Sequence, residues 1–102
     1  MPERTYPSQQ DEALRQAGPG PDARAVLTAI ADRLTENWPD LVARESSRPA
    51  LALRYSTELY GFHTRRALAA EAETLKHAPQ VRDDETRGEY ALRLRKAAGG
   101  AR

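Results

Sequence analysis

The sequence lacks cysteine and is poor in large apolar residues. The absence of cysteine excludes disulfides, thiolate metal sites and cysteine nucleophiles. Leu, Ile, Val and Phe together number 16 of the 102 residues, below the roughly 20% under which a highly charged chain is disordered. The net charge is only +1, so we do not expect disorder. We expect instead a helical domain with a thin core, which a second copy or another partner would complete.

Long apolar runs are absent as well. No stretch approaches the roughly 20 residues that cross a bilayer, and the first residues lack the apolar segment of a signal peptide. We therefore expect a cytoplasmic protein that makes no contact with membranes. The nearly balanced charge is also far from the strongly basic composition that is typical of nucleic-acid-binding domains.

Glycine and proline mark one clear internal boundary, at residues 18–21, where they alternate. We predict three regions around it. Residues 1–21 form a flexible N-terminal arm with a possible short helix at residues 9–17, residues 22–98 form a helical bundle, and residues 99–102 form a frayed end. No segment alternates apolar and polar residues as a half-buried strand would, which makes the expected fold class all-α.

The first helix of the bundle is predicted over residues 22–37. Val26, Leu27, Ile30 and Leu34 follow one another at helical spacing and form a single apolar stripe. The helix should end at Trp38, because the residue before a proline is disfavoured in the α region. We expect Trp38 to anchor the core at this corner.

A short second helix is predicted at residues 39–45, beginning with Pro39. Leu41 and Val42 would then point inward. The last helix is expected to begin at the three consecutive acids of residues 83–85 and to end at Gly99.

The longest helical stretch is predicted at residues 49–77, as one long central helix around which the bundle forms. Leu51, Tyr55, Leu59 and Phe62 share one side of it, whereas the apolar residues after Arg66 lie on another. The apolar stripe thus changes face across residues 61–66. Either the helix bends at Gly61, or its two halves pack on different neighbours.

The aromatic and basic residues of this stretch carry the main functional hypothesis. Tyr and Arg are enriched at the energetic centres of protein interfaces, and here they spread over a wider arc than one neighbouring helix would cover. We therefore predict a non-enzymatic protein–protein interaction or regulatory module, acting as a homodimer or as a subunit of a larger assembly. The predicted interaction residues are Tyr55, Leu59, Tyr60, Phe62, His63, Arg65 and Arg66.

An alternative is a small DNA-binding regulator. Residues 28–45 partly match the buried pattern of a helix-turn-helix, with residues 39–45 as the reading helix. Arg44 and Arg48 could then contact phosphates. Binding of this kind would weaken steeply as the salt concentration rises.

A more remote alternative comes from the segment His63-Thr64-Arg65-Arg66-Ala67. It resembles the histidine phosphotransfer domains, in which the phosphoryl-accepting His on a bundle helix is followed by a Lys and then a small Gly. Arg66 stands at the Lys position and Ala67 at the Gly position. The resemblance would imply that His63 accepts a phosphoryl group.

No other pattern indicates chemistry. The acids at residues 83–85 lack the spacing of a calcium loop and suit the positive end of a helix dipole instead. Catalytic sets and phosphate-binding loops are not apparent in the sequence. We therefore expect no enzyme activity, no cofactor and no metal.

Overall fold

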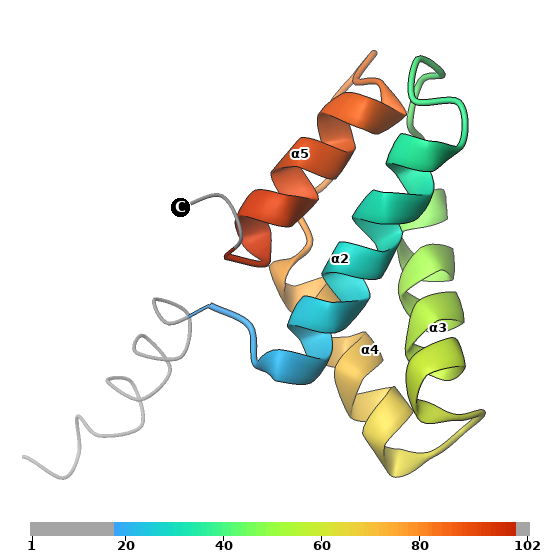
Figure 1. The fold of residues 1–102 in the computed structure, drawn as a ribbon, viewed down its shortest axis with the longest axis vertical. Coiled ribbons are helices and arrows are strands. Elements are labelled where there is room, and N and C mark those ends of the chain that lie inside the picture. The colour runs from blue at the N-terminus through green and yellow to red at the C-terminus, as the bar shows by residue number, and fades with distance from the viewer. Residues whose placement is uncertain (1–17, 100–102) are drawn as a thin grey trace, which may run out of the picture.

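The computed structural model describes residues 18–99, and these residues fold into four helices (Figure 1). They are α2 (Pro21–Glu36), α3 (Ser47–Tyr60), α4 (Arg65–His77) and α5 (Arg87–Ala97). The only strand-like pairing within this part of the chain is one isolated antiparallel bridge, between Val42 and Thr86. The all-α prediction is confirmed. The predicted arm with its short helix at residues 9–17, and the last three residues, lie outside the described part.

Helix α2 occupies the centre of the bundle. It packs against α3, α4 and α5, and in Figure 1 it crosses in front of the hairpin formed by α3 and α4, with α5 beside it. The predicted stripe of Val26, Leu27, Ile30 and Leu34 is buried, with at most 3% of each residue exposed. On α5, Tyr90 and Leu94 complete this core, while Leu92 points outward.

The prediction of one long central helix is wrong. The chain leaves the helix at Gly61 and starts a new one at Arg65, so α3 and α4 form an antiparallel hairpin. Gly61 has φ 101° and ψ 153°, a conformation that is essentially open only to glycine. The break falls within residues 61–66, where the apolar stripe changes face.

The buried residues of α3 and α4 are small. The two helices bury alanine, serine and threonine rather than leucine. Five of these small residues are exposed by 3% or less: Ala52, Ser56, Ala67, Ala70 and Thr74.

The predicted short helix at residues 39–45 is also wrong, because this segment is a loop. Its backbone pairs with the start of α5: Ala43 N donates to Glu85 O at 2.8 Å and Gly88 N donates to Pro39 O at 2.9 Å. Hydrogen bonds to residues 85–88 thus take the place of the bonds that a helix at residues 39–45 would make within itself. Trp38 does not anchor the core but is 70% exposed, and Leu41 and Val42 are more than half exposed instead of pointing inward.

Helix α5 begins later than predicted. The cap is Thr86, whose side chain accepts from Glu89 N while the Glu89 carboxylate accepts from Thr86 N, so both ends of a capping box are present. The acids of residues 83–85 precede the helix. Among them Glu85 is turned inward and only 6% exposed.

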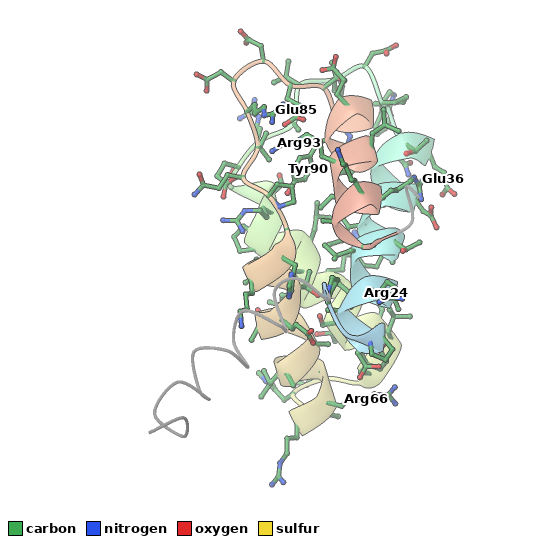
Figure 2. The ribbon with its side chains drawn as sticks, turned by 90° about the vertical axis from the view of Figure 1, so that its left-hand side faces the viewer. Arg24, Glu36, Arg66, Glu85, Tyr90 and Arg93 are labelled. Atoms are coloured by element: carbon green, nitrogen blue, oxygen red, sulfur yellow. The ribbon has the colours of Figure 1, made fainter. Side chains whose placement is uncertain are left out.

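Glu85 joins the loop before α5 to the helix itself, as Figure 2 shows for Glu85, Arg93 and Tyr90. Its Oε1 accepts from Arg82 N at 2.9 Å and from Arg93 Nη1 at 2.6 Å. Burial opposes ionisation of this carboxyl group, but the two donors outweigh burial and lower its pKa. The Tyr90 hydroxyl donates to Pro79 O at 2.6 Å, and burial raises the pKa of Tyr90 to about 12.

Two buried hydroxyl groups have no hydrogen-bond partner within the described residues, those of Ser56 and Thr74. An unpaired buried hydroxyl costs about 1–3 kcal/mol. We expect Ser56→Ala and Thr74→Val each to raise the free energy of unfolding by about 1 kcal/mol, measured by chemical denaturation. The exposed Thr28→Val is the control and should change it by less than about 0.5 kcal/mol. Lower stability of Ser56→Ala would show that its hydroxyl is bonded.

The Glu85 ion pair should make stability depend on pH. Since folding lowers the pKa of this carboxyl group, the pair stabilises fully above the ordinary carboxyl pKa of about 4.3. The stabilisation is lost as the pH falls through the lowered pKa of the folded state. We expect Glu85→Gln to reduce the free energy of unfolding at pH 7 by about 2 kcal/mol, and this deficit should shrink in acid.

Chemical denaturation of the intact chain and of Glu85→Gln, from pH 7 into acid, measures the difference between their free energies of unfolding. Asp84→Asn is the matched control, because Asp84 is the exposed neighbour and its left-handed backbone, with φ 61°, suits asparagine. Parallel stability curves for Glu85→Gln and the unchanged chain would contradict the assignment.

Candidate interaction surface

A tight turn at residues 61–64 joins α3 to α4 and fixes how the neighbouring side chains are presented. Thr64 secures it from both sides: its hydroxyl donates to Tyr60 O at 2.7 Å and accepts from Ala67 N at 3.0 Å. The second bond caps the N-terminus of α4. A Cβ atom at Gly61 would lie 2.8 Å from Thr64 Cγ2, so only glycine fits here.

This turn holds several apolar and basic side chains in solvent. Phe62 is 75% exposed and Leu59 is 48% exposed. The ring of Phe62 lies 4.0 Å from that of His63, centroid to centroid. Arg65 is exposed and has no ion-pair partner among residues 18–99. We call Leu59, Phe62, His63 and Arg65 the hairpin tip.

Arg66, in contrast, is committed to holding the fold. Its guanidinium group makes two bonds to the Asp22 carboxylate, at 2.7 and 2.9 Å, and lies 4.3 Å from the centre of the Tyr60 ring. The bonds from Arg66 lower the pKa of Asp22, although burial acts against them. This cluster ties the hairpin to the N-terminus of α2, near the bottom of Figure 2.

The seven predicted interaction residues thus fall into two groups. Tyr55 and Tyr60 are half-buried and pack against the core, and burial raises the pKa of Tyr60. Together with Arg66 they support the fold. The exposed group is the hairpin tip. Sequence spacing could not separate the groups, because it depends on where the helix breaks and on which face α2 covers.

The residues predicted to contact DNA are not placed as a helix-turn-helix would place them. The expected reading helix is a loop. Arg48 pairs with Glu45 at 2.7 Å, and its Nη1 donates to Leu75 O at 3.4 Å. The Glu45 carboxylate also accepts from Val81 N at 2.8 Å, and this bond is the main cause of its lowered pKa. Arg44 remains exposed.

His63 does not lie on a helix. It occupies the turn between α3 and α4 with a left-handed backbone, φ 57°. The resemblance to the histidine phosphotransfer domains therefore loses the helical position of its histidine. Within residues 18–99, no three histidine or acidic side chains gather where they could hold a metal ion. None of the described helices combines the length and apolar character needed to cross a membrane.

Sequence reasoning missed a second exposed apolar surface, the loop that follows α2. Trp38, Leu41 and Val42 are 70, 54 and 55% exposed. We call residues 37–43 the Trp38 loop. The sequence does carry a signal for it, since Pro39 and Asp40 suit the central positions of a turn. The helical spacing of the apolar residues in the same segment favours a helix instead, so the two local signals conflict.

Comparisons of the chain with protein-family models, with curated proteins and with solved structures find no match.

The conformation of Gly61 leads to a direct test of the turn. Gly61→Ala would force a Cβ atom into Thr64 and into a backbone region that L-residues avoid. We expect the free energy of unfolding to fall by about 1–3 kcal/mol, measured by chemical denaturation. The adjacent Phe62→Ser is the control. Its side chain is exposed, so stability should change by less than about 0.5 kcal/mol. Equal stability of Gly61→Ala would refute the close contact.

Proposed function

We propose that this protein is a non-enzymatic protein–protein interaction module and that the hairpin tip is its docking surface. The observation that carries the proposal is Phe62, a large aromatic residue that is 75% exposed on a turn closed by two hydrogen bonds of the Thr64 hydroxyl. Single exposed apolar residues are ordinary on protein surfaces. Here the His63 ring lies 4.0 Å from the Phe62 ring, centroid to centroid, and Leu59, three residues before Phe62, is exposed as well.

The physical argument rests on the low entropy cost of binding. Side chains that are already held in one arrangement lose less conformational freedom when a partner covers them. The turn is closed by the two Thr64 bonds, and the Arg66–Asp22 pair holds the hairpin against α2. The hairpin tip is therefore preorganised for binding.

The chemistry of the tip also suits an interface. Aromatic residues, Phe among them, and arginine are enriched at the centres of protein interfaces. Arg65 is available for this role, whereas Arg66 is paired with Asp22. A partner would need an apolar hollow for Phe62 and an acidic group within reach of Arg65.

Affinity capture with the intact chain tests the proposal. We expect Phe62→Ser to lose the captured partner, because truncating a central aromatic anchor costs about 2 kcal/mol or more in binding. Quantitative mass spectrometry of the bound proteins measures the loss. Leu92→Ser is the matched control, since Leu92 is 68% exposed but lies on α5.

The Leu92→Ser chain should retain the partner. Circular dichroism should show the same helix content for both variants. If the Phe62→Ser chain captures the same proteins in the same amounts as the intact chain, the hairpin tip is not the docking surface.

A further inference from the structure

Two exposed apolar surfaces lie at opposite ends of the bundle. The hairpin tip is next to the N-terminus of α2, because Arg66 binds Asp22. The Trp38 loop begins at Asn37, the C-terminal cap of the same helix. The 16 residues of α2 separate the two ends by about 24 Å. Figure 1 shows the loop at the top of the bundle and the turn between α3 and α4 at the bottom.

The Trp38 loop is held in place by the fold rather than by its own side chains. Arg87 N donates to Leu41 O at 2.8 Å, and Arg87 Nε donates to Asn37 O at 2.9 Å. Trp38 adopts a left-handed backbone, φ 52°, while 70% of it stays exposed. That conformation is unfavourable for a bulky residue. The side chain of Trp38 is too exposed for its contacts within the chain to offset this backbone cost. Residues with unfavourable backbone conformations cluster at functional sites.

A hollow accompanies this loop. Its volume is about 490 Å³, and its lining combines apolar side chains with two carboxylates: Glu36, Asn37, Trp38, Pro39, Asp40 and Leu41. Glu36 and Asp40 are exposed and have no ion-pair partner within residues 18–99. The hollow is open to solvent, and its lining offers both apolar side chains and these two carboxylates.

This is the chemistry that the hairpin tip requires of a partner. The tip exposes Phe62 and, three residues later, Arg65, and the lining of the hollow includes Trp38, Leu41, Glu36 and Asp40. Two like ends fit each other less well. Two hollows would bring carboxylates together, and two tips would bring arginines together, whereas opposite ends pair opposite charges.

We propose that copies of this chain associate head to tail, with the hairpin tip of one copy docked in the hollow of the Trp38 loop of the next. This inference rests on the proposed function and names the partner as a second copy. Such a contact joins two different surfaces, so it continues from copy to copy into rings or open chains instead of stopping at a two-fold dimer. Each end offers only a few large apolar side chains, so the contact is weak and reversible.

Mixing of two variants, each blocked at one end, tests this arrangement. Trp38→Asn blocks the hollow, and asparagine tolerates the left-handed backbone; Phe62→Ser blocks the tip. Sedimentation velocity is measured from about 1 µM to about 1 mM, which spans weak association. We expect the intact chain to grow beyond a dimer as its concentration rises, and each variant alone to associate at least about tenfold more weakly.

The equimolar mixture gives the decisive result. Each variant keeps one working end, so the mixture should form a 1:1 dimer and stop there. A dimer formed by either variant alone, or a mixture that stays monomeric while the intact chain associates, would overturn head-to-tail docking. Leu92→Ser, altered on α5, should associate like the intact chain. At about 1 µM, where the weak contact is dissociated, both end variants should melt close to the temperature of the intact chain, which shows that they fold.

A strictly monomeric intact chain would also overturn this inference. The proposed function would still stand if the intact chain captures a different protein and the Phe62→Ser chain does not. If the intact chain captures no other protein but associates with itself in the ultracentrifuge, the second copy is the partner.

Discussion

Burial of the apolar stripe on α2 is the constraint on which the other described helices depend. Val26, Leu27, Ile30 and Leu34 are almost fully enclosed, and each side chain of this size contributes about 1.5–3 kcal/mol when it leaves water. Besides these four, only two large apolar residues of the described part are buried as deeply, Tyr90 and Leu94. Helices α3, α4 and α5 pack around α2, and the buried residues of α3 and α4 are small.

A core of this kind leaves the connecting segments to be held by polar contacts. Asp22 and Arg66 fix one end of the hairpin, Glu73 accepts from Gly20 N at 2.7 Å, and Glu85 holds the loop before α5. These contacts keep the Trp38 loop and the hairpin tip in defined positions without burying them. The apolar residues that would enlarge the core stand outside it, where a partner can cover them.

The sequence predicted the parts of this arrangement that depend on local spacing. The stripe on α2 follows from a period of 3.6 residues and is buried as predicted. The weak point at residues 61–66 was visible as a change of face and an internal glycine. The sequence did not show that the helix ends there, because a helix interior tolerates a glycine at a cost of about 1 kcal/mol. The backbone of Gly61 and the cap by Thr64 decide between a bend and a break.

The sequence by itself determined the helical class, the buried face of α2 and the place where the longest stretch divides, because each of these depends on residues within a few turns of one another. The tertiary structure alone decided which side chains are left in solvent. Residues 39–43 pair with residues 85–88, and Arg66 reaches Asp22 from the far side of the hairpin. Contacts between residues so distant in the sequence form only when the helices pack together, so local spacing does not predict them. Such contacts left Trp38 exposed instead of anchoring the core, and they paired Arg66 with Asp22.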